Sequence, residues 1–259
     1  MLANYHTHTY HCRQAGGTPE EYVKTAIENG LDILGFSDHV PYPAKEGFVS
    51  GMRMPLSETE KYVAEINELR QAYGQKIKIY IGYEAEYFPE YFDAMLKNIG
   101  KYGCNYLILG QHYIDSESDG FYSGNLCGEP QLKRYVDQVI EAMKTGMFSY
   151  VAHPDLIRYR ENTAVYRKEM SRLCQASLDY DVPLEFNLLG FRERRFYPYS
   201  EFWKLVSEMG CKTVIGWDAH SPEYAGDRSI YNEALAELKK FGITPVEIID
   251  LKHNGKLFK

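Results

Sequence analysis

Short apolar runs alternate along the chain with longer segments in which apolar residues recur every three or four positions. Runs of the first kind predict strands, and segments of the second kind predict helices. The predicted strands are 2–8, 33–38, 77–84, 104–110, 148–152, 183–187 and 213–217, and the predicted helices are 19–29, 57–73, 89–100, 130–145, 163–180, 200–210 and 230–241. Seven strand–helix units in succession predict an α/β fold with parallel strands.

Several predicted helices have recognisable ends. Thr18 is followed by Pro19 and Glu21, which predicts a capping box with proline in the first helical turn. Serines are expected to begin two further helices and glycines to end three of them, at Ser57, Ser200, Gly30, Gly74 and Gly210.

Polar residues decide between the two architectures that seven parallel strands allow, a closed barrel and an open doubly wound sheet. Seven of the eight histidines, all but His253 in the polar tail, fall in strand-end stretches. In a barrel these ends meet at one mouth, whereas an open sheet would spread them along an edge. We therefore expect one barrel domain over 1–259, with these residues at its mouth: His6, His8, His39, Glu84, His112, His153, Asp218 and His220.

Composition narrows the range of partners. The formal net charge of −7 and the isoelectric point near 5.7 argue against nucleic acid and against an anionic membrane. No basic leader precedes an apolar core, and no apolar run approaches the roughly 20 residues of a membrane span, so we expect a soluble, cytoplasmic protein with a small-molecule substrate. The five cysteines are scattered and never spaced as CxxC, which predicts neither disulfides nor a thiolate zinc site. The oligomeric state is left open.

The histidine spacing suggests a metal site. On a strand, residues two apart point to the same side, so His6 and His8 can present both imidazoles to one ion, as can Asp218 with His220. An isolated HxH occurs by chance on many strands. The other polar residues at the strand ends favour metal binding for the group as a whole.

Six motifs, in this order, carry a family resemblance: HTHT at 6–9, GFSDHVP at 35–41, GYEAEY at 82–87, GQHYID at 110–115, AHPDL at 152–156 and GWDAH at 216–220. With them the chain resembles the PHP family, named for polymerase and histidinol phosphatase, and within it the histidinol-phosphate phosphatases. The resemblance implies a distorted seven-stranded (β/α) barrel. It also implies a metal-dependent phosphomonoesterase that converts L-histidinol phosphate to L-histidinol and phosphate in histidine biosynthesis.

The resemblance further implies two or three divalent ions. Oxygen and nitrogen ligands without thiolate admit manganese, iron or zinc. The implied ligands are His6, His8, Glu84 and Asp218 for the first ion, and the bridging Glu84 with His112 and His153 for the second.

A third ion would use His39 and His220, and here the chain departs from the family pattern. The family has another histidine at the position of Gln14. A glutamine offers only a neutral carbonyl oxygen, so Gln14 is expected to be a weak ligand and the third ion to bind less tightly. His11 is an alternative ligand, but it lies three residues from His8 and would require the loop to turn back.

Clustered cations suit the hydrolysis of phosphate esters, because they neutralise the phosphoryl oxygens and lower the pKa of a bound water. The catalytic groups are expected to be a metal-bound hydroxide with Glu84 and Asp218. Among the arginines at 158, 160, 192, 194 and 195, Arg158 and Arg194 are the predicted phosphate-binding pair. Glu86, two residues beyond Glu84, and Asp38 are expected to orient a ligand imidazole or to contact the substrate.

Two other functions remain open. A related enzyme acting on another phosphomonoester or on a nucleotide would carry the same metals. A metal-binding protein with impaired turnover is the second alternative, with Gln14 as the sign of the impairment.

Overall fold

The computed structural model describes residues 1–43 and 45–252, so His253 lies outside the described residues. Its main sheet is a row of seven parallel strands in the order β1-β2-β3-β4-β8-β10-β11. These are β1 (Ala3–Asn4), β2 (Ile33–Phe36), β3 (Lys78–Ala85), β4 (Tyr106–Leu109), β8 (Phe148–Val151), β10 (Leu184–Asn187) and β11 (Thr213–Gly216).

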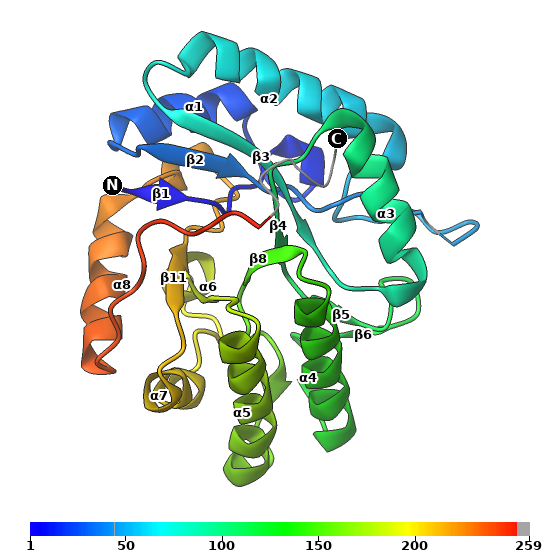
Figure 1. Cartoon of the computed structure of the whole chain (residues 1–259), viewed down its shortest axis with the longest axis vertical. Helices are drawn as coiled ribbons and strands as arrows, with labels where there is room; N and C mark the ends of the chain where they lie inside the picture. Colours follow the sequence, from blue (N-terminus) through cyan, green and yellow to red (C-terminus); the bar gives the residue numbers. More distant parts are fainter. Residues whose placement is uncertain (44, 253–259) are drawn as a thin grey trace.

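The first and last strands of this row approach each other at their carboxyl ends. A parallel bridge pairs Thr7 with Ala219, and the amide of His8 donates to the Ala219 carbonyl at 2.9 Å. The sheet is therefore a nearly closed barrel (Figure 1). The prediction of a seven-stranded parallel barrel is confirmed, and the open sheet is excluded.

Helices surround the strands on the outside (Figure 1). Each predicted helix agrees with an observed one to within two residues at either end. The observed helices are α1 (Pro19–Glu28), α2 (Thr59–Tyr73), α3 (Pro89–Tyr102), α4 (Glu129–Lys144), α5 (Thr163–Asp179), α7 (Ser200–Met209) and α8 (Arg228–Lys240), with a short α6 (Leu188–Arg192) that was not predicted.

Some helices begin at the residues that the sequence predicts. The Thr18–Glu21 capping box is present, with the Thr18 amide donating to Glu21 Oε2 at 2.6 Å. Helix α7 begins at Ser200 as predicted. Helix α2 begins two residues after Ser57, because a 3-10 turn over Leu56–Glu58 precedes it.

Strand β1 is much shorter than the predicted strand 2–8. The side chain of Asn4 accepts hydrogen bonds from the amides of His6, at 2.9 Å, and Trp217, at 3.4 Å. These bonds replace the regular backbone hydrogen bonds between strands, because the side-chain oxygen of Asn4 accepts where a strand carbonyl otherwise would. The chain consequently leaves the sheet after Asn4 and rejoins it only at the Thr7 bridge.

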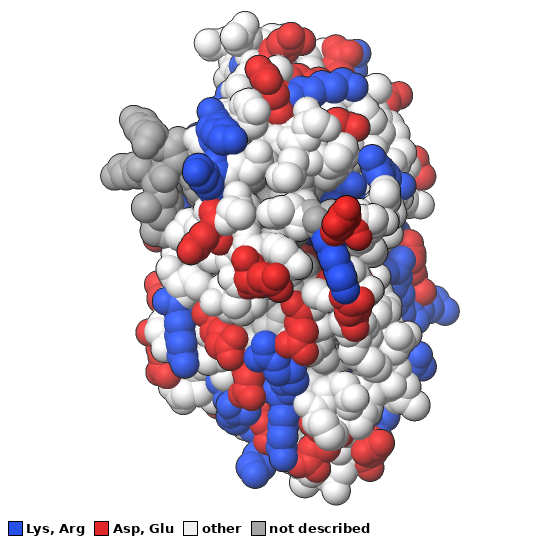
Figure 2. Space-filling model, turned by 90° about the vertical axis from the view of Figure 1, so that its right-hand side faces the viewer, with Lys and Arg blue, Asp and Glu red and all other residues white. Residues whose placement is uncertain are grey.

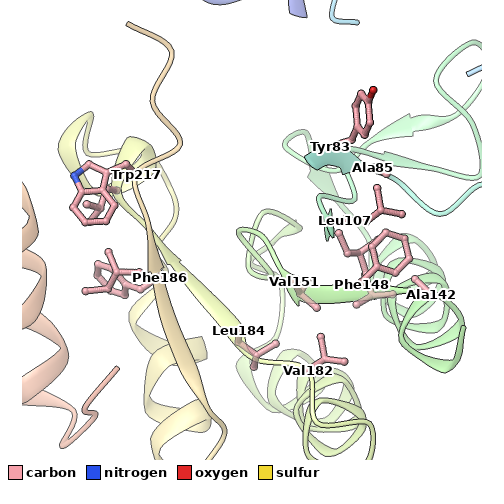
Figure 3. Close-up of a cluster of buried hydrophobic side chains, with 14 of the residues drawn as sticks. Tyr83, Ala85, Leu107, Ala142, Phe148, Val151, Val182, Leu184, Phe186 and Trp217 are labelled. Atoms are coloured by element: carbon pink, nitrogen blue, oxygen red, sulfur yellow. The ribbon is translucent and has the colours of Figure 1, made fainter. Parts of the chain in front are cut away.

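Alternation along the strands separates the core from the barrel interior. Leu184 and Phe186 of β10 pack outward in the apolar cluster between strands and helices (Figure 3). Residues two apart share a side, so Glu185 and Asn187 point inward. In β3, Tyr83 packs outward in the same apolar cluster (Figure 3). The alternation therefore directs the neighbouring Glu84 toward the barrel axis.

A second apolar layer fills the barrel below its mouth. Tyr106 crosses the interior, and its hydroxyl donates to the carbonyls of Tyr5, at 2.7 Å, and Phe36, at 3.0 Å. A Cβ at Gly35 or Gly82 would lie within 2.4 Å of the Tyr106 side chain, so both positions need glycine. This floor leaves the carboxyl ends of the strands as the open end of the barrel.

Short strands extend the loops at this open end. They are β5 (Tyr113–Ile114), which pairs with β6 (Phe121–Tyr122), and β7 (Leu126–Cys127), which pairs with β9 (Arg158–Tyr159). All five cysteines are buried free thiols. Within residues 1–43 and 45–252, no helix is long and apolar enough to cross a bilayer. Acidic and basic side chains are interspersed over the face that Figure 2 shows.

Candidate metal centre

The barrel mouth brings together all eight residues that the sequence placed there. Each lies at or just beyond the end of a strand, and every one except His112 and His220 is at most 3% exposed. They are His6 and His8 after β1, His39 after β2, Glu84 in β3, His112 after β4, His153 after β8, and Asp218 and His220 after β11.

Glu84 lies at the centre of the cluster, and its two oxygens face different imidazoles. Oε2 lies 3.1 Å from His39 Nδ1 and 3.2 Å from His8 Nε2. Oε1 lies 2.8 Å from His153 Nε2 and 3.6 Å from His112 Nε2. A carboxylate arranged in this way can bridge two cations. This position depends on Gly110, where a Cβ would lie 1.8 Å from Glu84 Oε1.

Asp218 supplies the second buried carboxylate. Its Oδ1 lies 3.2 to 3.5 Å from ring nitrogens of His220, His8 and His6, but it has no hydrogen-bond partner among the described residues. His6 Nε2 and His8 Nε2 are only 3.1 Å apart. Lone pairs that converge in a buried space need a cation between them, so the donor set fits a divalent metal.

A further group of imidazoles lies beside this set. The rings of His39 and His220 lie on either side of His8, with ring centroids 4.6 and 4.3 Å from that of His8. The three residues can offer ligand atoms within 4.8 Å of one another. Gln14 lines the cavity beside them. His11 Nε2 lies 2.9 Å from Glu65 Oε2 on α2, and among the described residues His11 is not in the group whose ligand atoms converge with those of His39 and His220.

The pKa values of the carboxyls and imidazoles in the cluster are shifted in different directions. Burial alone would raise the pKa values of the Glu84 and Asp218 carboxyls, but the surrounding histidines outweigh it and hold both well below their usual range. Burial lowers the pKa of His8 to about 4. Burial also lowers the pKa of His39 well below its ordinary value. The ionised carboxylates and the neutral imidazoles of His8 and His39 are in the protonation states that divalent metals bind. Nearby carboxylates outweigh burial at three of the other histidines and raise the pKa values of His6, His112 and His220.

The centre forms the base of a cavity of about 510 Å³. Of the arginines that the sequence offered, Arg195 lines this cavity and donates to the Tyr197 hydroxyl at 3.1 Å. Among the described residues, the lining includes neither Arg158, which lies over the Phe196 ring, nor the exposed Arg194. Phosphate binding by Arg158 and Arg194 therefore stays a prediction, and Arg195 has the better position for it.

Glu86 and Asp38 have different surroundings. Glu86 is fully buried, pairs with both terminal nitrogens of Arg53 and lies 3.4 Å from His112 Nδ1, where it can orient a ligand imidazole. Asp38 instead accepts hydrogen bonds from the amides of Thr9, at 2.7 Å, and Cys12, at 3.2 Å. Asp38 thus holds the loop that follows His8.

Three buried residues of the centre were not anticipated. Glu185 lies 2.7 Å from His6 Nδ1, Asn187 donates to Asp218, and Arg53 neutralises Glu86. An acid within the apolar run PLEFN was the available signal for Glu185, because a charged residue in a buried strand needs a partner. Nothing comparable marks Arg53, which lies in a loop.

Comparison with known proteins agrees with this geometry. The profile of the PHP domain matches residues 4–188, more than half of the chain. The chain belongs to the PHP domain family. A protein of Deinococcus radiodurans named probable histidinol-phosphatase is 28% identical over 253 residues, which cover 93% of this chain and 94% of that protein. A protein of Schizosaccharomyces pombe with the same name is 26% identical, covering 98% and 92%.

A solved structure shares the fold of this chain. A crystal structure of the histidinol phosphate phosphatase of Lactococcus lactis, complexed with zinc, L-histidinol and phosphate, superposes with a TM-score of 0.73. The two sequences are 22% identical, and the superposition covers 96% of this chain and 98% of the other. This likeness supports the PHP barrel described above.

Proposed function

We propose that this PHP protein is a metal-dependent phosphomonoesterase that hydrolyses L-histidinol phosphate to L-histidinol and phosphate. The observation that carries the reaction class is the buried Glu84, whose two oxygens face separate groups of imidazoles at the mouth of the barrel. The substrate is supported by the names of the relatives that match over nearly the whole chain. Histidine biosynthesis is the corresponding role.

Different ligand residues would hold different ions. His6, His8, Glu84 and Asp218 would hold one ion, and Glu84 would share a second with His112 and His153. When bound, such ions neutralise phosphoryl oxygens and make a nucleophile available at neutral pH. The protein itself supplies the two ionised carboxylates, excludes bulk water from the buried imidazoles and fixes where the phosphate lies.

Substrate binding is assigned to the cavity wall. Arg195 would donate to the phosphate, since guanidinium forms directed bonds to phosphoryl oxygens that an ammonium cannot match. Glu193 also lines the cavity and is suited to the cationic end of an amino alcohol. The rings of Tyr122 and Tyr197 provide an apolar surface for an imidazole.

The number of ions depends on Gln14. His39 and His220 would hold a third ion, and the amide of Gln14, which lines the cavity, would add only a weak ligand. Changing Gln14→His is expected to raise the third-ion content of dialysed protein toward one equivalent, measured by elemental analysis. An unchanged metal content would show that position 14 does not limit this site.

A panel of phosphate esters tests the proposed substrate. L-Histidinol phosphate, a nucleoside monophosphate, phosphotyrosine and a phosphodiester are supplied to protein loaded with manganese, iron(II) or zinc, and phosphate release is measured. We expect the highest kcat/KM for L-histidinol phosphate. A higher kcat/KM for another monoester would show that the substrate is different but that the protein is a phosphomonoesterase. Metal binding without phosphate release from any ester would favour a metal-binding protein with impaired turnover.

A further inference from the structure

Two neighbouring polar side chains of β10 contact three proposed metal ligands that come from three different strand ends. Glu185 reaches His6 and His153, and Asn187 reaches Asp218. We propose that Glu185 and Asn187 are positioning residues: they hold these ligands in place and join them to the segment that lines the substrate cavity. The inference rests on the metal-binding role proposed above.

Glu185 fixes the orientation and the tautomer of His6. Its Oε1 lies 2.7 Å from His6 Nδ1, and both side chains are fully buried. A carboxylate can only accept at this distance, so the hydrogen of the imidazole is held on Nδ1. The lone pair of Nε2 then faces Glu84 and Asp218, each with an oxygen 3.5 Å away. A carboxylate behind a ligand histidine also increases its basicity toward the metal.

The other oxygen of Glu185 holds a strained part of the backbone. Oε2 accepts from the amide of His153 at 3.0 Å, and His153 has a φ of 30°, in the region that disfavours residues with a side chain. This bond therefore helps to fix the conformation that directs the His153 imidazole to Glu84. The space for the carboxylate comes from Gly216, where a Cβ would lie 1.7 Å from Glu185 Oε1.

Asn187 connects the ligands to the cavity wall. Its Nδ2 donates to Glu185 Oε2 at 2.9 Å and to Asp218 Oδ2 at 3.0 Å. Its Oδ1 accepts from the amide of Gly190 at 2.9 Å and so caps α6. The chain beyond α6 carries Glu193, Arg195 and Tyr197 into the cavity. One amide thus joins a metal ligand to the wall that would bind the substrate.

The two residues are expected to give different defects. In Glu185→Gln, the amide either offers a donor to His6 Nδ1 or turns its donors toward the His153 amide and Asn187, so one set of contacts is lost. Metal affinity should fall about 10- to 100-fold, as is usual when a partner of a ligand histidine is removed. In Asn187→Ala, the amide of Gly190 loses its acceptor and α6 its cap. Phosphate binding by metal-saturated protein should then weaken about three- to tenfold.

The test measures metal and phosphate binding separately. Manganese and zinc affinities are determined by competition with a chromophoric chelator in the absence of substrate, and inorganic phosphate is titrated calorimetrically into metal-saturated protein. Glu169→Gln, a buried carboxyl on α5 paired with Arg172, is the control for Glu185, and Asn162→Ala, the cap of α5, is the control for Asn187. Both controls should match the wild type in both measurements.

Metal affinity of Glu185→Gln within twofold of Glu169→Gln would overturn the role of Glu185. If Glu185→Gln does not fold, Glu185→Asp decides: the shorter acid should also lose metal affinity, and wild-type affinity would refute the role. Phosphate binding by Asn187→Ala equal to that of Asn162→Ala would overturn the role of Asn187. A wild type that binds metal and cleaves no ester would refute the proposed function, yet these binding comparisons would still test the positioning residues.

Discussion

Replacement of Arg53 by methionine is expected to lower the free energy of unfolding by about 3–5 kcal/mol, the usual cost of removing one partner of a buried ion pair. Arg53 is 4% exposed and donates to Glu86 at 2.9 and 3.0 Å, to Glu117 at 2.7 Å and to the Val40 carbonyl at 2.9 Å. Methionine replaces most of the aliphatic volume, so the lost charge dominates the effect. Among the described residues, the fully buried carboxylate of Glu86 would then have His112 Nδ1, at 3.4 Å, as its remaining partner.

Urea unfolding of the metal-free protein at pH 8 measures this change. Burial alone would raise the pKa of Glu86, but Arg53 outweighs it and holds that pKa below its ordinary value. Without Arg53 the pKa of Glu86 should rise, so the loss should shrink as the pH falls and the carboxyl becomes protonated. Glu86→Gln in the Arg53→Met background removes the unpaired charge and should recover part of the stability.

Arg167→Met is the matched control, because Arg167 pairs with Glu201 and Glu208 while its side chain is 31% exposed. Exposed pairs contribute little, so this change should cost less than about 1 kcal/mol. If Arg53→Met costs no more than Arg167→Met, or if the Arg53 and Glu86 changes are simply additive, the reasoning about the buried pair is refuted.

Three further predictions concern single positions. Gly110→Ala places a Cβ against Glu84 and should reduce the metal retained after dialysis; full metal content would contradict the tight fit. Arg195→Gln should weaken inorganic phosphate binding about 10- to 100-fold with unchanged metal content, because one charge-assisted hydrogen bond is lost; equal phosphate affinity would exclude Arg195 from the site. The hydrogen bond from the Thr18 amide lowers the pKa of Glu21, so its stabilisation should be present above the unfolded pKa of the carboxyl and lost as the pH falls through the folded value. Glu21→Gln should therefore destabilise the protein at pH 7 but not at pH 2, and thermal unfolding at both pH values checks this.

The barrel was predictable because its signals are local and repeated. Seven apolar runs each followed by a helical segment define parallel strand–helix units, and parallel strands place their ends at one mouth. The eight residues brought together there were found by this rule and by the family motifs. The boundaries of β1 were not predictable, since the Asn4 side chain interrupts the ladder through a contact with Trp217, over 200 positions away.

The residues around the ligands were harder to predict, because their contacts also join positions far apart in the sequence. Arg53 lies in a loop, and only the folded chain shows that it reaches Glu86. The sequence did not indicate that Arg195 lines the cavity and Arg194 does not, because Arg194 has a φ of 53° and the turn there decides which side chain enters the cavity. Local patterns indicate which residue types are available, and the loop conformation determines which of them face the site.

Phosphate release from L-histidinol phosphate by wild-type and Glu84→Gln protein, each analysed for bound metal, tests the central claim most directly. Glu84→Gln keeps the shape of the side chain but removes the charge that both groups of imidazoles share. We predict metal-dependent release by the wild type, with both tightly bound metal and release lost in the variant. Release by the variant at the wild-type rate, or by wild-type protein stripped of metal, would contradict a metal centre built on Glu84.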